Sequence, residues 1–379
     1  LIVLLILSGY MLEKLMNYER IPFRELMLNT QTILIVGLQI FIVLSWMKNL
    51  ETYGQSLYTN DSLYLLSQGL KPFLVYCLFL FFIKDEKSLQ KIFWVIVLGG
   101  ATSSILCIFR YIGSGGTARG MGFSLDPNYF GLYLTLPFLL SLNFMISEEI
   151  WSKKLSAAFC FLIISTAILL TLSRATWIGV FIAFFIFLSK HQKRTRLLAI
   201  VSIIFIVLVV ANFHVIYSRV FEAFNPQSTF YERLKLSRIA IMMFRDHWLW
   251  GVGFGNFINH VGKYLGAVDL PQYDIHIAHN SYLSFFAETG IFGGILFLII
   301  SLLAWLNCYR ALKLSIRVNS LALFNLALPL EAALIGTLII MASITAGDEY
   351  FFWMMVSLSC ATLKLSRQSI GKEDVILVK

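Results

Sequence analysis

Long apolar segments recur along this chain, and most of the connectors between them are short and polar. Several of these segments run for about 18–20 residues, which is enough for one helix to cross roughly 30 Å of hydrocarbon. Hydrophobic residues make up 58% of the sequence and charged residues only 13%, so these segments lack the charged faces that a soluble helical protein needs. The sequence therefore predicts an all-α protein, a polytopic transmembrane helical bundle.

The apolar pattern predicts about eleven spans in this chain and about twelve in an intact one. The first apolar run, Leu1 to Met11, has no basic segment before it, so we interpret it as the remainder of a truncated helix and not as a signal peptide. The other spans are expected near 29–47, 65–83, 92–111, 128–146, 155–172, 176–189, 197–211, 283–305, 319–343 and 351–364.

These spans divide the chain into three expected regions. They are an N-terminal transmembrane bundle (1–211), an extracytoplasmic loop containing short helices (212–280), and C-terminal transmembrane helices with a cytoplasmic tail (281–379). The net charge of +9 comes largely from lysines and arginines in short connectors, the positive-inside pattern, so it indicates orientation and not nucleic-acid binding. The five cysteines lie singly in or beside apolar segments, without metal or disulfide spacing.

Two arginines are expected at outward-facing helix ends. Arg119 belongs to the glycine-rich connector 113–122, which leads to Asp126-Pro127, the pattern of an N-cap followed by proline at the first helical position. Arg174 lies between two strongly apolar stretches, where an arginine is costly unless it faces an aqueous cavity or binds an anion. A guanidinium binds phosphate through paired hydrogen bonds and keeps its charge. The alternatives are simple flexibility of the glycines and an Arg174 that snorkels to lipid headgroups.

The connector 212–280 is long enough to hold extracytoplasmic structure. Its segment Thr229 to Phe244 predicts an amphipathic helix that could lie on the membrane interface. The apolar positions are Leu234, Ile239, Ile241 and Met242, and the polar positions are Arg233, Lys235 and Arg238. The glycine-rich run at 251–257 has no strand or Rossmann unit around it, so we exclude dinucleotide binding.

The loop ends in His279-Asn280-Ser281-Tyr282-Leu283 and passes through Glu288-Thr289-Gly290 into an apolar segment. A titratable side chain is thus held at the membrane surface, where a lipid-borne substrate can be reached. The alternative is that His279 is a helix-start residue satisfied by hydrogen bonds. His276 and His279 have an H-x-x-H spacing with Asp269 and Asp274 nearby, but nothing places the four together, so we expect no metal site.

Three carboxylates elsewhere are possible acids or bases. Glu331 follows Pro329 inside a predicted span, so it is either functional or hydrogen-bonded within the bundle. Asp348 and Glu349 lie at the outer end of the last hairpin, where they could face the same cavity as His279 or cap a helix.

Taken in chain order, these motifs resemble the O-antigen ligase and O-antigen polymerase superfamily of bacterial membrane glycosyltransferases. The resemblance covers roughly residues 110–300, and any single piece of it is weak. Trp248 departs from the pattern, because a proline usually stands before the G-V-G run. The similar pieces are Arg119 with Asp126-Pro127-Asn128, Ser173-Arg174-Ala175-Thr176-Trp177, Arg233 leading to Gly251-Val252-Gly253-Phe254-Gly255-Asn256-Phe257, and His279-Asn280-Ser281-Tyr282-Leu283.

The resemblance implies an enzyme of the bacterial cytoplasmic (inner) membrane whose active site faces outward. It would transfer a glycan from undecaprenyl diphosphate to a hydroxyl of a lipid-linked glycan or lipid core, in synthesis of O-antigen, capsule or exopolysaccharide. In that interpretation Arg119 and Arg174, with Arg233 as a third, stabilise the leaving diphosphate. His279 takes the acceptor proton, and Asn280 orients the acceptor or caps the next helix. No metal or cofactor is expected.

The sequence leaves two other classes of function open. A polysaccharide or lipid transporter, a flippase, would show inverted repeats and broken helices in both halves, and the sequence shows no clear internal repeat. A structural membrane protein would leave the outer arginines replaceable. Polymerase and ligase remain inseparable, because both use a lipid diphosphate donor and differ in what attacks it.

Overall fold

The structure is a computed structural model that describes residues 29–53, 62–124, 126–191, 229–268 and 277–377, together with Tyr217 and Phe221. Within these residues the regular structure is entirely helical. Seven described helices are long and apolar enough to cross a membrane. They are α3 (Thr30–Lys48), α5 (Ser62–Phe82), α6 (Glu86–Gly113), α7 (Pro127–Ser147), α8 (Trp151–Leu170), α14 (Ser281–Arg317) and α15 (Leu321–Met341).

The remaining described helices are shorter, more polar or at the chain's end. They are α4 (Leu50–Tyr53), α9 (Arg174–Lys190), α12 (Thr229–Asp246), α13 (Phe257–His260), the 3₁₀ helices η2 (Val261–Lys263) and η3 (Leu265–Ala267), and α16 (Tyr350–Leu377). The prediction of an all-α protein with several membrane spans is confirmed. The count of eleven stays a prediction, and the expected spans 1–11 and 197–211 lie outside the described residues.

The chain folds into two compact units, each assembled from three separate segments. The first unit comprises Leu1–Ile83, Glu232–Leu306 and Thr345–Ala361, and the second comprises Lys84–Tyr231, Asn307–Ile344 and Thr362–Lys379. The three regions expected from the sequence were defined by membrane topology, whereas these two units are defined by compactness. The three regions therefore remain a prediction.

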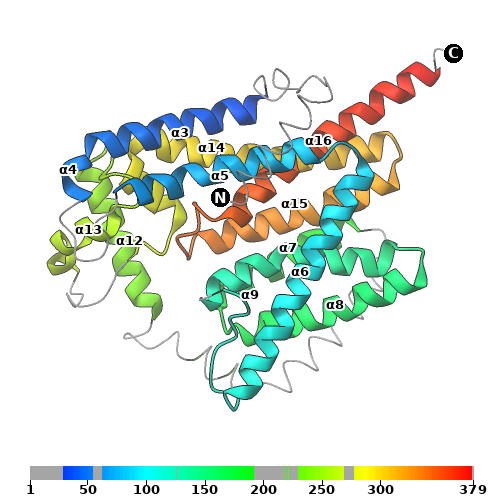
Figure 1. Ribbon diagram of the computed structural model, residues 1–379, viewed down its shortest axis with the longest axis horizontal. Helices are drawn as coiled ribbons and strands as arrows, with labels where there is room; N and C mark the ends of the chain where they lie inside the picture. Colours follow the sequence, from blue (N-terminus) through cyan, green and yellow to red (C-terminus); the bar gives the residue numbers. More distant parts are fainter. Residues whose placement is uncertain are drawn as a thin grey trace. The chain divides into compact units, whose positions relative to one another are not determined.

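In the first unit, α3 lies along α5 and along the first part of α14 (Figure 1). Phe41 of α3 stacks on Phe292 of α14, with ring centroids 5.2 Å apart. Polar side chains add hydrogen bonds inside this apolar packing: Gln31 Nε2 donates to the carbonyl of Ile300 at 3.0 Å. Such bonds tie membrane helices together where lipid supplies no hydrophobic drive between them.

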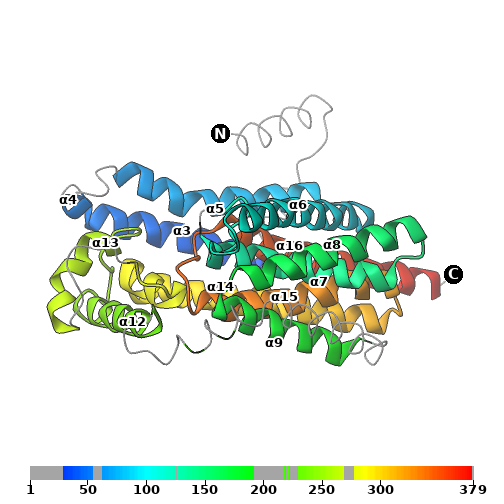
Figure 2. The ribbon, with the colours of Figure 1, turned by 90° about the horizontal axis from the view of Figure 1, so that it is seen from below.

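In the second unit, α7 packs against α6, α8, α9 and α15 (Figure 2). Most side chains of α7 are buried. Helices α9 and α15 approach closely at Gly179 and Gly336, where a Cβ on either residue would lie 2.7 Å from the other's carbonyl oxygen. Small residues at this crossing let the two backbones meet, as is common between membrane helices.

The helix starts follow from local chemistry. Asp126 caps α7 by accepting hydrogen bonds from the backbone N–H of Asn128 (2.6 Å) and Tyr129 (3.1 Å), with Pro127 at the first helical position. Ser173 caps α9 in the same way through Thr176 N. The predicted N-cap at Asp126 is confirmed.

Candidate functional site

Three sequence motifs of the second unit meet around the side chain of Arg119. Its Nε donates to the carbonyl of Thr171 at 3.0 Å, and its Nη2 donates to Asn128 Oδ1 at 3.3 Å. Ser173 Oγ donates to the same Asn128 oxygen at 2.8 Å. Arg119 is therefore fixed between the start of α7 and the turn that leads into α9.

The backbone supports the same junction. Gly120 N donates to the carbonyl of Leu170 at 2.8 Å, and a Cβ at Gly120 would lie 3.1 Å from that carbonyl oxygen. The glycine thus allows the Arg119 loop to lie directly against the end of α8. Close approach, and not flexibility alone, explains a glycine here.

Arg174 is the first residue of α9, directly after the Ser173 cap. Its side chain is half-buried, and its Nη2 lies 3.4 Å from Thr229 Oγ1. Arg119 is also half-buried and bonds the carbonyl of Thr171 in the same turn. Two guanidinium groups beside the positive N-terminal ends of α7 and α9 make a local environment suited to an anion.

In the first unit, His279 lies two residues before the start of α14, in an uncommon backbone conformation. Its φ is +47°, in the left-handed region that non-glycine residues seldom adopt, and its side chain is half-buried. Asn280 Oδ1 accepts hydrogen bonds from Tyr282 N (3.1 Å) and Leu283 N (3.0 Å). Of the two roles expected for Asn280, the structure shows helix capping. Arg233 lies half-buried in α12.

Asp348 and Glu349 belong to the same unit as His279. The buried hydroxyl of Ser281 accepts a 2.9 Å hydrogen bond from the backbone of Ala346, which joins the loop after α15 to the first turn of α14. His279 and Asp348 are each two residues from this bond. Burial, with the neighbouring Glu349 carboxylate as a second cause, raises the pKa of Asp348 to about 6. The loop thus brings a carboxyl that titrates near neutral pH to the His279 end of α14.

Glu288 has a structural role that sequence reasoning did not assign. Its buried carboxylate accepts the backbone N–H of Phe257 at 3.3 Å, and its carbonyl accepts Gly253 N at 2.9 Å. Val252 N donates to Ala287 O at 3.0 Å. The glycine-rich run 251–257 is therefore docked on the first part of α14. A carboxylate within an apolar helix was the signal that could have pointed to it.

Two glycines permit this docking. Gly290 has φ +71° and ψ −167° inside α14, a conformation available essentially to glycine, and a Cβ there would overlap the backbone of Leu249. Gly251 has φ +69°, and a Cβ there would overlap the backbone of Glu288. Ile291 N, just beyond the bend in α14, donates to the carbonyl of Trp248 at 2.8 Å.

The end of this run is also tied down. Asn256 is fully buried, and its Nδ2 donates to Thr52 Oγ1 and to the carbonyl of Val252, both at 2.7 Å. His260, which sequence reasoning passed over, is buried with Nδ1 3.1 Å from the carbonyl of Asn256. Burial lowers the pKa of His260, so the protein favours the neutral imidazole at this position.

Glu331 is buried in α15 of the second unit and pairs with Lys190. Both carboxylate oxygens lie 2.7 Å from Lys190 Nζ. Lys190 is the last residue of α9 and Arg174 is the first, so about 24 Å of helix separates their backbones. The pairing corresponds to the second role that the sequence left open for Glu331, a bond inside the bundle.

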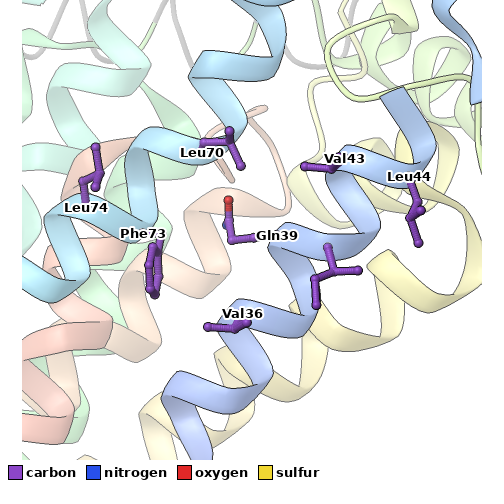
Figure 3. A pocket seen from close by; sticks show the side chains of 8 residues that line it. Val36, Gln39, Val43, Leu44, Leu70, Phe73 and Leu74 are labelled. Atoms are coloured by element: carbon purple, nitrogen blue, oxygen red, sulfur yellow. The ribbon is translucent and has the colours of Figure 1, made fainter. Parts of the chain in front are cut away.

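A hydrophobic groove of about 530 Å³ lies between α3 and α5 of the first unit (Figure 3). Its lining is apolar except for Gln39, whose buried amide atoms have no hydrogen-bond partner among the described residues. The lining side chains are Val36, Gln39, Ile40, Val43, Leu44, Leu70, Phe73 and Leu74. A groove of this composition suits a hydrocarbon chain.

Among the described residues, no group of three or more His, Cys, Asp or Glu side chains is placed to hold a metal ion. The described part of the chain does not include the three residues that lie near His279 in the sequence, Asp269, Asp274 and His276.

Comparison with protein families adds an independent observation. Residues 159–298 match the family model described as O-antigen ligase. This part of the chain is similar to O-antigen ligases. The matched segment runs from α8 into α14 and contains Arg174, Arg233 and His279, whereas Arg119 precedes it. The match supports the resemblance to the O-antigen ligase and polymerase superfamily, and the seven long apolar helices described above agree with a membrane protein. Comparison with curated proteins finds no match.

Proposed function

We propose that this protein is a polyprenyl-diphosphate-dependent glycosyltransferase. It transfers a glycan from undecaprenyl diphosphate to an acceptor hydroxyl, without a metal, in synthesis of a surface polysaccharide. The observation that carries the proposal is the junction of the second unit, where Asn128 and the Thr171–Ser173 turn hold Arg119 next to the start of α9 and Arg174. Cations fixed by a surrounding hydrogen-bond network are what a diphosphate leaving group needs.

The reaction forms a bond between the acceptor oxygen and the anomeric carbon and breaks the bond from that carbon to the diphosphate oxygen. The electron pair of the broken bond stays on the diphosphate. Arg119 and Arg174 bind this group, and they bind it more strongly as its charge grows in the transition state. Arg233 is a third candidate for the same group.

The proton of the acceptor hydroxyl goes to His279. An imidazole has a pKa suited to this step near neutral pH. Asp348, which is joined to the same helix end through the Ser281–Ala346 bond, and Glu349 are the alternative bases. Arg119 and Arg174 belong to the second unit, and His279 belongs to the first, so a cavity shared by these three residues stays a prediction of the sequence.

A donor with a lipid chain is accessible to a protein whose helices cross the membrane. The apolar groove between α3 and α5 offers a place for part of its isoprenoid chain. The acceptor is a second lipid-linked glycan in a polymerase and a lipid core in a ligase, and the proposed residues serve both. We place the reaction at the outer face of the bacterial cytoplasmic membrane, where the positive-inside charge pattern puts the 212–280 loop.

Purified protein and a lipid-linked glycan donor test the proposal. Arg174→Ala should weaken donor binding and slow turnover, and Arg174→Lys should recover only part of each, because a lysine lacks the paired hydrogen bonds of a guanidinium. His279→Ala should leave donor binding near normal and lower turnover by about 10²–10⁴-fold. Full activity in His279→Ala would move the base to Asp348 or Glu349. Loss of activity on chelation would contradict the arginine-based account, and lipid movement without bond formation would favour a flippase.

A further inference from the structure

Helix α12 has two opposed faces. Leu236, Ile239, Ala240 and Met243 are fully buried and form a core with the 251–257 run and the helices that follow it. The sequence expected Ile239 and Ile241 on one apolar face, and the structure separates them. Ile241 belongs to a second, exposed face. Its members recur at intervals of four, three, four and three residues, which is the period of one side of a helix. They are Leu234, Arg238, Ile241 and Arg245, and Trp248 continues the same spacing in the turn two residues beyond the end of α12.

The exposed face alternates large hydrophobic side chains with cations. Leu234 is 51% exposed, Ile241 54% and Trp248 57%. Arg238 and Arg245 stand between them, also exposed. The one ion pair that Arg245 makes among the described residues is a loose contact with the adjacent Asp246, at 3.6 Å. Aliphatic and indole groups alternating with arginines match the boundary of a bilayer, where hydrocarbon meets phosphate.

The position of this face in the first unit points to the same partner. The carbonyl of Trp248 accepts the N–H of Ile291, the first residue beyond the bend of α14 and the start of its long apolar stretch. The next residue, Phe292, is 46% exposed, and Ile295 and Leu298 continue an exposed apolar surface along α14. The α12 face therefore ends beside the start of this exposed apolar surface of α14.

The direction of α12 also agrees with a position at the membrane surface. In Figure 1 this helix lies at the end of the unit where α14 begins, and it runs across the direction of α3 and α14. Because α3 and α14 are candidate membrane spans, a helix that crosses their direction at one end lies along the membrane plane. Tryptophan is enriched at this level of a bilayer.

We propose that Leu234, Arg238, Ile241, Arg245 and Trp248 form a membrane-docking face, the α12 docking face, that binds anionic lipid headgroups. The three hydrophobic side chains enter the acyl boundary, and the two guanidinium groups bind lipid phosphates. Docking fixes the 251–257 run, which packs on the opposite face of α12, at the membrane surface. This inference is independent of glycan transfer and holds or fails whatever the reaction is.

Spin labels on the full chain in lipid vesicles test the proposal. Leu234→Cys and Ile241→Cys report on the α12 docking face, and Lys263→Cys, exposed on η2 in the same unit, is the matched control. The five native cysteines are buried, and unlabelled protein measures their background. In phosphatidylglycerol vesicles, labels at 234 and 241 should collide several-fold more with oxygen than with an aqueous nickel chelate, relative to the label at 263. Equal aqueous access at all three positions would refute docking, and shielding from both reagents would show that a protein covers the face instead.

A second arm tests the headgroup. Arg238→Gln combined with Arg245→Gln should lower the docking equilibrium about 30-fold in anionic vesicles, since each arginine near such a surface contributes about fivefold. Label immersion in this variant should match that of the parent protein in phosphatidylcholine vesicles, and about 0.5 M salt should produce the same release. Immersion that is unaffected by vesicle charge, by salt and by both substitutions would overturn the assignment of the arginines to lipid phosphate.

Discussion

The bend of α14 at Gly290 provides a direct test of how the 251–257 run is held. Gly290→Ala places a methyl group against the backbone of Leu249 and 2.8 Å from Trp250 N, in a backbone conformation that alanine does not adopt. The chain can relieve this only by changing the bend or by moving the 248–253 segment away from α14. Either response separates two segments that lie about 40 positions apart in the sequence and meet only through the fold.

The size of the effect follows from the bonds that cross this contact. Three backbone hydrogen bonds join the segments: Val252 N to Ala287 O, Gly253 N to Glu288 O, and Ile291 N to Trp248 O. Each contributes about 1 kcal/mol, so their loss lowers the local stability of the docked segment by about 3 kcal/mol, or about 100-fold in its opening equilibrium.

Hydrogen–deuterium exchange of the full chain in lipid nanodiscs measures that equilibrium. Peptides covering 248–257 should exchange about 100-fold faster in Gly290→Ala than in the parent protein. Gly262→Ala is the matched control, because a Cβ at Gly262 meets no atom within 4 Å and should leave the exchange unchanged. Exchange in Gly290→Ala within about threefold of the parent would refute the docking energetics argued from these contacts.

Three further predictions concern the other polar contacts. Lys190→Met should lower the melting temperature in nanodiscs more than Glu331→Gln does. The first substitution leaves the buried Glu331 carboxylate unpaired, whereas the second leaves Lys190, whose side chain is 34% exposed and can reach water. Equal shifts of the melting temperature would contradict this reasoning. Asn128→Ala removes the acceptor of Arg119 Nη2 and should weaken binding of the lipid diphosphate about tenfold. Unchanged donor affinity would show that Asn128 does not position this arginine. Because the pKa of Asp348 is raised, the folded state binds its proton more tightly than the unfolded state does. The parent protein should therefore lose stability as the pH rises from about 4 to 6, and Asp348→Asn should reduce that loss. Parallel stability–pH curves for the two proteins would refute this prediction.

The amino-acid sequence was sufficient to predict the described helices and several of the residues at which they begin. A run of apolar residues long enough to cross hydrocarbon has few alternatives to a helix, whatever surrounds it. A cap such as Asp126 or Asn280 bonds to backbone N–H groups two or three residues away, so its effect is also local. Because such effects are local, the sequence alone also indicated that residues 119, 174 and 279 lie at or near helix ends.

The partners of these residues were decided by the tertiary structure. Asn128 meets Ser173, and Lys190 meets Glu331 across 141 positions, because helices far apart in the sequence pack side by side. Ile239 and Ile241 are the same residue type on one helix, yet one is fully buried and the other is 54% exposed. Hydropathy assigns both to an apolar surface, but only packing against the 251–257 run determines which of the two enters the protein core and which remains for the membrane.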